Sequence, residues 1–350
     1  MSVTMSDVAR HVGVSKQTIS AVINGKPGIS ADTIARVKQA IAELGYQPNL
    51  VASSLRLGYT KSIGLLLSNV ANPWFAEIAR GVEDVALARG YSVMLCNTYD
   101  DPDKLELYLN VFIRQRTAGV IGISANDAAK IAHATSCVFQ SLNPINSARG
   151  AYVATAHLLS LGHRRIGCIT ALPNNTVALE RLQGYRAALA DWNIVVDENM
   201  IISGDFDYAS GLRAAEQLLR LPTLPTAVFA HQDLLAIGII AGLQRAGIRV
   251  PEDIAIVGYD GLEIASVYNP PLSTIIQPTH AMGMQAMRLL ADKLEGKTSD
   301  ETEPLHCQLA VRRSTVPTLA QEWISPDIDT ATTPWLGWQS SEDTLPSRIP

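Results

Sequence analysis

At 350 residues the chain is too long for one typical domain, and its 47% hydrophobic and 17% charged residues supply sizeable cores and exclude global disorder. No apolar run is long enough to cross a bilayer and the N-terminus has no secretory signal, so we expect a cytoplasmic protein with no membrane partner. The formal net charge is −5, but the first 60 residues hold six basic against three acidic side chains, which predicts a small basic module on an acidic body.

The cysteines and catalytic motifs argue against an enzyme. The sequence contains no GxGxxG, GxxxxGK[ST] or HExxH, and its seven histidines form no cluster with metal-ligand spacing. No CxxC pair exists, so we expect buried thiols rather than disulfides at Cys96, Cys137, Cys168 and Cys307. We therefore predict no catalytic activity, no cofactor and no metal site.

The first 45 residues show three short helical patterns. The first helix ends at Gly13, which can take the positive φ of a sharp turn, after apolar residues on one face: Met5, Val8, Ala9 and Val12. Ser15 is a good N-cap for a second helix over 16–24, and Ser30 for a third helix that Gly45 ends. Two short helices around a glycine turn, supported by a third, are typical of a helix-turn-helix unit whose second helix enters the major groove of DNA. The alternative is a three-helix bundle with a solvated polar face.

These residues carry a family resemblance. The stretch "SDVARHVGVSKQTISAVINGKPGISADTIARVKQAIAELGYQPNLVASSLR" resembles the headpiece of the lactose and galactose repressor family. The resemblance implies that Lys16 and Gln17 read bases, and that Ala21 stands where many members carry a larger polar side chain. Ala21 can touch a thymine methyl but cannot form a bidentate hydrogen bond. The implied DNA-binding residues of the three helices are Ser6, Ser15, Lys16, Gln17, Thr18, Ser20, Ala21 and Asn24.

The segment 46–60 follows as a hinge. Pro48 ends the third helix and Asn49 can cap a short new one. By itself this stretch is too short for a stable isolated helix, so a passive tether is one interpretation. The resemblance implies instead a hinge helix that orders on the operator and wedges Leu55 into the minor groove, with Arg56 near the backbone. We count Asn49, Ala52, Leu55 and Arg56 among the DNA-binding residues.

From residue 62, short β-rich runs alternate with amphipathic helices. The first series begins with "SIGLLLS" and a helix over 75–89, and the series restarts with a helix over 150–161 and "RRIGCITA". Continuous apolar strands between helices indicate parallel sheets covered on both faces. The predicted fold class is therefore α/β, with an all-α helix-turn-helix headpiece (1–45) and two doubly wound parallel subdomains within 61–317. We expect one subdomain over about 61–142 and 277–300, and the other over about 150–275 and 303–317.

The resemblance continues through the body, in "NPWFAEIARGVE", "LGHRRIG", "ERLQGYRAAL", "RVPEDIAIVGYDG" and "NPPLSTI". It implies a periplasmic-binding-protein-like core that closes on a small effector, most often a sugar or a nucleoside relative. Ligands of open α/β sheets bind beyond the carboxyl ends of the strands. By the resemblance Arg181 binds the ligand and Asp260 accepts its hydroxyls. The candidate effector-binding residues are Asn72, Trp74, Phe75, Arg181, Phe206, Gln232, Asp233 and Asp260.

Several of these residues also have a purely structural interpretation. Trp74 and Phe75 as bare aromatics would more often be core residues. Arg181 or Asp260 alone would more often form a surface ion pair or a helix cap. Asp233 can simply cap the helix expected over 233–246, and Gln232 stands where relatives often carry Asn.

Two regions depart from the family pattern. Between 125 and 149, Gln140 and Ser141 stand near a position where relatives commonly have an acidic residue. The connection 142–150 spans at most about 28 Å, which leaves little chain for an additional strand. A short crossover would alter hinge motion, weaken effector binding or destabilise the subdomain. The tail 318–350 has three tryptophans and no periodicity, and we expect it to be disordered, with a partner-binding peptide as the alternative.

Together these patterns predict a DNA-binding transcriptional regulator. We expect a repressor, associated with the nucleoid, that binds a pseudo-palindromic operator in double-stranded DNA as a homodimer and responds to a sugar or nucleoside-like effector. The alternatives are a solute-binding protein, or an effector-blind regulator if the 125–149 crossover disables the switch.

Overall fold

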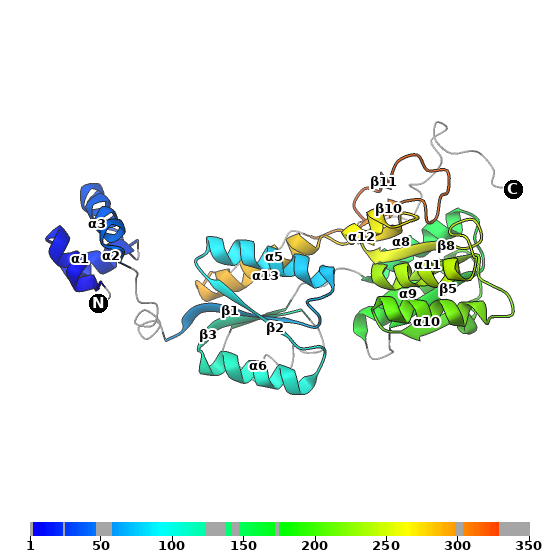
Figure 1. Ribbon diagram of the computed structural model, residues 1–350, viewed down its shortest axis with the longest axis horizontal. Helices are drawn as coiled ribbons and strands as arrows, with labels where there is room; N and C mark the ends of the chain where they lie inside the picture. The colour runs from blue at the N-terminus through cyan, green and yellow to red at the C-terminus, as the bar shows by residue number, and fades with distance from the viewer. Residues whose placement is uncertain are drawn as a thin grey trace. The chain divides into compact units, whose positions relative to one another are not determined.

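The computed structural model describes residues 3–23, 25–46, 58–123, 138–141, 147–171, 175–297 and 304–328. Internal contacts divide the chain into Met1–Lys61, here called the headpiece, and Ser62–Pro350, the body (Figure 1). Within the described segments, no helix is both long and apolar enough to cross a membrane.

The headpiece consists of α1 (Met5–Val12), α2 (Lys16–Ile23) and α3 (Ala31–Leu44). Gly13 takes φ 75° at the end of α1, and Gly45 takes φ 62° at the end of α3. Ser15 Oγ accepts the N–H of Thr18 at 3.1 Å, and Ser30 Oγ accepts the N–H of Thr33 at 3.3 Å. The predicted glycine turns and serine caps are thus confirmed.

The three helices enclose a small apolar core. Arg36 Nη2 of α3 donates to the main-chain oxygen of Val12 at 2.7 Å, which satisfies a carbonyl that the end of α1 leaves unpaired. The buried residues come from every helix: Val8, Ala9, Val12, Ile19, Val22, Val37, Ala40 and Tyr46. Because two of them, Ile19 and Val22, belong to α2, the opposite side of α2 is turned outward.

The first sheet of the body has four strands in the order β2-β1-β3-β4. The strands are β1 (Thr60–Leu67), β2 (Ser92–Asn97), β3 (Thr117–Gly122) and β4 (Val138–Ser141). β1 pairs with β2, and β3 with β4, in parallel register. Figure 1 shows α5 (Pro73–Ala88) and α13 (Thr279–Leu294) on one face and α6 (Pro102–Arg114) on the other.

Glycines bring α5 and α13 together backbone to backbone. A Cβ on Gly81 would lie 2.1 Å from the main-chain oxygen of His280, and one on Gly283 would lie 2.1 Å from that of Ile78. Any side chain at either glycine would therefore force the helices apart. The subdomain is completed by a helix encoded about 200 residues after its first helix.

The second sheet has seven strands in the order β11-β10-β9-β8-β7-β5-β6. The strands β5, β6, β7, β8 and β9 run parallel, and β10 and β11 are antiparallel. Their bounds are β5 (Ile166–Ala171), β6 (Ile201–Gly204), β7 (Ala227–Ala230), β8 (Ala255–Asp260), β9 (Ser273–Ile276), β10 (Gln308–Val311) and β11 (Trp323–Ile324).

Two helix pairs cover this sheet and form two apolar cores. One core contains residues of α8 (Ser147–Ser160) and α9 (Thr176–Asp191), and the other residues of α10 (Tyr208–Leu219) and α11 (Asp233–Arg245). A 3-10 turn, η1 (Glu198–Met200), precedes β6, and a short helix, α12 (Glu263–Val267), follows β8. The two doubly wound subdomains predicted from the alternating pattern are confirmed.

The predicted disorder of the tail is wrong for residues 318–328. Here the chain forms β11, and the N–H of Ser325 donates to the main-chain oxygen of Leu309 at 2.9 Å. The N–H of Ile328 donates to the main-chain oxygen of Cys307 at 2.8 Å, and Arg312 Nε donates to Glu322 at 2.7 Å. We call residues 312–328 the C-terminal strap. Residues 329–350, with Trp335 and Trp338, lie outside the described residues.

The crossover region is described in part. β4 is the edge strand of its sheet, and Gln140 within it is buried and accepts a hydrogen bond from Lys293 Nζ of α13 at 2.7 Å. α8 begins at Ser147, three residues before the predicted start. The segments 124–137 and 142–146 lie outside the described residues, so the effect of a short crossover stays a prediction. Cys96, Cys168 and Cys307 are buried free thiols, as predicted, and Cys137 is outside the described part.

Candidate DNA-binding and effector sites

The first turn of α2 presents the DNA-binding candidates. Ser15, Lys16 and Gln17 are exposed. Thr18, Ser20 and Ala21 are half-buried on the same helix, and Ser6 is half-buried on α1. The remaining candidates lie outside the described residues: Asn24, Asn49, Ala52, Leu55 and Arg56.

Capping accounts for two of these side chains. Ser15 Oγ accepts the N–H of Thr18 and also lies 2.9 Å from Thr18 Oγ1. Both hydroxyls therefore shape the start of α2, whereas Lys16 and Gln17 extend from its exposed first turn. The positive end of a helix dipole and a lysine at this position both favour a phosphate or an acceptor on a base edge.

The effector candidates of the second sheet gather at one edge. β7, β8 and β9 are neighbouring parallel strands, so their carboxyl ends meet. His231 and Gln232 follow β7, Asp260 ends β8, and Gln277 follows β9. Arg181 reaches the same edge from α9, since its guanidinium contacts two of these residues.

Arg181 is a buried cation that is only partly satisfied. The residue is 5% exposed; its Nη1 donates to the main-chain oxygen of His231, and its Nη2 lies 3.4 Å from Asp260 Oδ1. Its Cζ lies 3.7 Å from the ring centroid of Tyr259 and 6.0 Å from that of Phe206, which is half-buried. Its buried Nε has no hydrogen-bond partner among the described residues.

Asp260 completes the pair in a strained backbone conformation. Its Oδ1 accepts a hydrogen bond from Gln277 Nε2 at 2.7 Å, and its φ is 116°, which a residue with a side chain rarely adopts. Burial raises the pKa of Asp260 to about 6, although the positive charge of Arg181 acts in the opposite direction. A strained, buried carboxylate with a raised pKa is typical of a functional position.

Further unsatisfied polar atoms lie in both subdomains. Gln232 is the N-cap residue of α11 but makes no capping bond, and its buried Oε1 has no partner in the described chain. In the first sheet, Asn72 caps α5 through the N–H of Trp74 at 3.0 Å. The rings of Trp74 and Phe75 meet edge to face at 4.9 Å, and the buried Nε1 of Trp74 has no partner within the described segments. Buried polar atoms without a partner are uncommon in proteins, and a hydrogen-bonding ligand or a water molecule would satisfy them.

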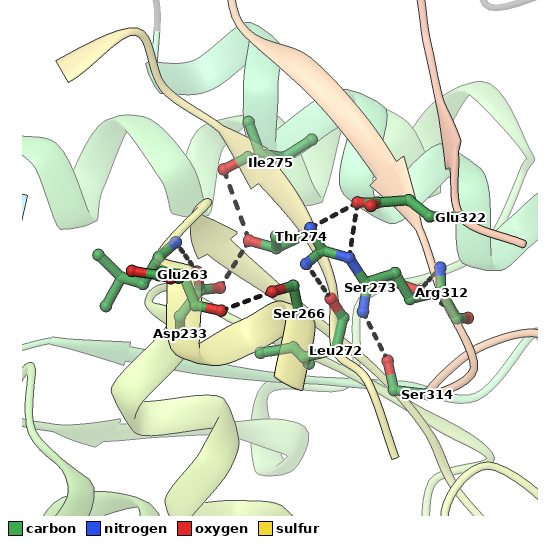
Figure 2. A network of polar contacts seen from close by, with 11 residues as sticks. Asp233, Glu263, Ser266, Leu272, Ser273, Thr274, Ile275, Arg312, Ser314 and Glu322 are labelled. Atoms are coloured by element: carbon green, nitrogen blue, oxygen red, sulfur yellow. Dashed lines mark hydrogen bonds and ion pairs between the residues drawn. The ribbon is translucent and has the colours of Figure 1, made fainter. Parts of the chain in front are cut away.

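Asp233 differs from the prediction. It is fully buried, and it does not cap α11: Oδ1 accepts the hydroxyl of Thr274 at 2.5 Å and Oδ2 accepts the N–H of Leu262 at 2.7 Å (Figure 2). Burial and the nearby charge of Asp260 raise its pKa to about 8. Both oxygens are occupied within the subdomain, so Asp233 connects α11 to β9 and to the start of α12, and its contact with an effector stays a prediction.

Three residues of this site are absent from the sequence-based set: His231, Tyr259 and Gln277. The main-chain oxygen of His231 accepts a hydrogen bond from Arg181, and the ring of Tyr259 stacks on the Arg181 guanidinium. The side-chain amide of Gln277 donates to Asp260. The rule that ligands bind at the carboxyl ends of parallel strands could have found His231 and Gln277, which each follow a strand directly. Tyr259 has no such signal, because it is an apolar-patterned residue within β8.

Comparison with known proteins gives the family. A model described as "Bacterial regulatory proteins, lacI family" matches residues 4–49, and one described as "Periplasmic binding protein-like domain" matches residues 155–315. The HTH-type transcriptional repressor PurR of Vibrio atlanticus (strain LGP32) is 35% identical over 332 residues, covering 90% of this chain and 99% of that protein. PurR of Actinobacillus pleuropneumoniae serotype 3 (strain JL03) is 36% identical, with 89% of this chain and 98% of that protein covered.

Solved structures agree with this result. The Lac repressor dimer bound to operator and the anti-inducer ONPF has a TM-score of 0.78 at 29% identity, covering 90% of this chain and 99% of that chain. The complex of the transcriptional regulator CelR with cellobiose has a TM-score of 0.65 at 32% identity, with 89% and 99% covered.

A helix-turn-helix headpiece joined to a periplasmic-binding-protein-like body defines a DNA-binding transcriptional regulator. The two PurR proteins are 35% and 36% identical to this chain and cover about nine tenths of it, which shows the family. The chain belongs to the lacI family of bacterial regulatory proteins and is a transcriptional repressor.

Proposed function

We propose that the repressor binds a pseudo-palindromic operator as a homodimer and that a small hydroxyl-bearing effector, a sugar or a nucleoside, controls it from the carboxyl edge of the second sheet. The effector part is carried by one observation. Arg181 and Asp260 form a buried ion pair. The Nε of this same Arg181 and the Oε1 of Gln232 are buried and have no partners among the described residues.

The chemistry of this edge suits a polyol. A ligand hydroxyl can accept from Arg181 Nε and donate to Gln232 Oε1 or to the Asp260 carboxylate. The half-buried Phe206 offers an apolar surface to a sugar C–H face or to a base. Solved neighbours support this class, since CelR was determined with cellobiose and a regulator of this family from Enterococcus faecium with ribose.

The DNA part follows from the headpiece. Two copies of α2 in a symmetric dimer match two half-sites, with Lys16 and Gln17 reading bases and Ala21 limited to an apolar contact. The hinge residues Asn49, Ala52, Leu55 and Arg56 remain part of this proposal. Closure of the body around the effector would bias whether the two headpieces pair on DNA.

The test starts from a thermal-shift screen of the full chain with cellobiose, D-ribose and adenosine. For a probe that raises Tm, isothermal titration should give at least about tenfold weaker binding to Arg181→Ala and Asp260→Asn, because each change removes a charge-assisted hydrogen bond. Arg186→Ala is the matched control: it lies on the same helix, but its guanidinium is exposed and pairs with Glu198 at 2.8 Å.

Two outcomes would contradict the effector proposal. Wild-type affinity in both Arg181→Ala and Asp260→Asn would place the ligand elsewhere. If no probe changes either Tm or operator affinity, the effector-blind regulator is the better description.

A further inference from the structure

Tyr259 lies directly beneath the guanidinium of Arg181. Its ring centroid is 3.7 Å from Arg181 Cζ, within the range of a cation–π contact, and the residue has no solvent exposure. The other contacts of Arg181 leave it room to tilt, because the Asp260 contact is long at 3.4 Å, the His231 carbonyl accepts only from Nη1, and the Phe206 ring lies farther away, at 6.0 Å from Cζ. The ring is therefore the surface that defines the plane of the guanidinium.

A glycine in the first turn of α8 fixes that ring in turn. A Cβ on Gly150 would lie 2.3 Å from Tyr259 Oη and 2.9 Å from its Cε2 and Cζ. The close approach means that α8 supports the ring edge, and only a residue without a side chain fits. α8 is the first described element after the crossover from β4, so the support of Tyr259 lies next to the connection between the two sheets.

We propose that Tyr259 is a positioning residue: held by Gly150 of α8, it orients the Arg181 guanidinium toward Asp260 and the effector. This inference rests on the proposed effector role of Arg181. If α8 moves relative to β8, Gly150 displaces the Tyr259 ring, and the ring in turn displaces the Arg181 guanidinium. This arrangement requires the aromatic ring beneath Arg181 and the missing Cβ at Gly150, and does not depend on core volume alone.

The test uses the titration of Asp260, which senses the position of Arg181 without any ligand. The groups that face this carboxyl are Arg181 of α9, Asp233 of α11, the phenol of Tyr259, the thiol of Cys307 and the neutral amides of Gln232 and Gln277. Burial raises the pKa of the Tyr259 phenol and of the Cys307 thiol, so both stay neutral from pH 5 to pH 8. The full-length protein is labelled with 13C at the aspartate side-chain carboxyls, and the Asp260 resonance is assigned by its loss in Asp260→Asn. Its midpoint is then followed by NMR from pH 5 to pH 8.

We expect Tyr259→Leu to move the Asp260 midpoint upward by about one pH unit, because a displaced Arg181 stabilises the carboxylate less. Tyr259→Phe keeps the ring and should leave the midpoint near that of the parent protein. Phe112→Leu, which removes a buried ring of α6 from the core of the other subdomain, is the matched control for core truncation and should lower Tm without moving the midpoint.

A second pair of variants tests the link to α8 if Tyr259→Leu fails to fold. Gly150→Ala should raise the Asp260 midpoint by pushing the ring away from Arg181. Adding Tyr259→Phe removes the atom closest to the new methyl group but keeps Cε2 and Cζ at 2.9 Å from it, so it should return the midpoint only part of the way. A midpoint unchanged in Gly150→Ala, with only Tm lowered, would show that Tyr259 is a packing residue and would overturn the proposal.

The two proposals fail differently. If the effector lies elsewhere, no probe will depend on Arg181, but the Asp260 midpoints will still move as described. If Tyr259 does not position Arg181, the midpoints will stay fixed, whether or not a sugar or nucleoside binds.

Discussion

Asp233 and Asp260 are two buried carboxyl groups with different neighbours. Asp260 faces Arg181, whereas Asp233 binds the Thr274 hydroxyl and the Leu262 N–H and has a pKa of about 8. A raised pKa means that folded Asp233 still carries its proton at a pH where the unfolded chain has lost it. Its contribution to stability is complete below about pH 4 and is lost as the pH rises through about 8.

Asp233→Asn should therefore remove one contribution to the pH dependence of stability. The Asp233 contribution to the free energy of unfolding falls between pH 5 and pH 8, with a slope of at most about 1.4 kcal/mol per pH unit, whereas the buried His157 and His231, whose pKa values burial lowers, act in the opposite direction below about pH 6.5. Urea denaturation at several pH values measures the slope. Asp253→Asn is the control: that carboxyl is exposed and Arg249 lowers its pKa to about 2, so its loss should leave the slope in this range unchanged.

An equal slope in the parent protein and in Asp233→Asn would contradict this account. It would mean that another buried group, not Asp233, takes up the proton on folding.

At the scale of elements, an ion pair within the C-terminal strap adds to the main-chain hydrogen bonds that hold β11 at the edge of the second sheet. Arg312 is 7% exposed, donates to the main-chain oxygen of Leu272 at 2.8 Å and pairs with Glu322 of the strap (Figure 2). The pair bridges the end of β10 and the start of β11, which itself has only two residues. Side-chain contacts therefore stabilise a strand that is too short to be held by its ladder alone.

Glu322→Ala should loosen the strap and lower the free energy of unfolding by about 1–2 kcal/mol, because Arg312 would lose its carboxylate while remaining buried. Hydrogen exchange should show faster exchange at the N–H groups of Ser325 and Ile328, whose acceptors lie at β10 and Cys307. Glu216→Ala removes an exposed partner of Arg220 and is the matched control, with little expected effect. Unchanged exchange at Ser325 would show that main-chain pairing alone holds the strap.

The sequence predicts elements that have a strong local pattern and misses those that do not. Runs such as "IGLLL" at 63–67 carry no polar side chain and belong to parallel strands buried on both faces, so they were predictable. β11 has no periodicity over two residues, and its position depends on Glu322 meeting an arginine ten positions away in the chain. Such pairing is a tertiary property and leaves no signal in a local window.

The sequence also predicts part of the candidate effector site and misses the rest. Arg181 and Asp260 could be assigned through the family resemblance and the strand-end rule, and the structure brings them together. The sequence could not separate Asp233 from Asp260, because both stand near the ends of strands. Their environments differ through Thr274 and Leu262, which belong to other elements.

At the scale of the whole molecule, a basic headpiece is attached to an acidic body, and the headpiece binds DNA. We expect Lys16→Ala to weaken binding to duplex DNA of mixed sequence and to reduce the slope of log K against log salt by about 1, since one phosphate contact is lost. Fluorescence anisotropy between about 50 and 200 mM salt measures this slope. Lys38→Ala, on the exposed side of α3, is the matched control and should change the slope less.

An unchanged slope in Lys16→Ala would mean that α2 does not face the phosphate backbone. A similar reduction in both variants would indicate a diffuse contact over the headpiece rather than one centred on α2.

The close packing of α5 against α13 also has a consequence for biosynthesis. During translation α5 is made early. Its partner α13 (279–294), which packs on it through glycines and also covers β3 and β4, is made about 200 residues later. The headpiece and the second sheet up to β9 can fold while translation continues, whereas the four-stranded subdomain must wait with β3 and β4 uncovered on the face that α5 shares with α13. The part of the body that is translated first is thus among the last to be finished, and during that interval it is the part most in need of a chaperone.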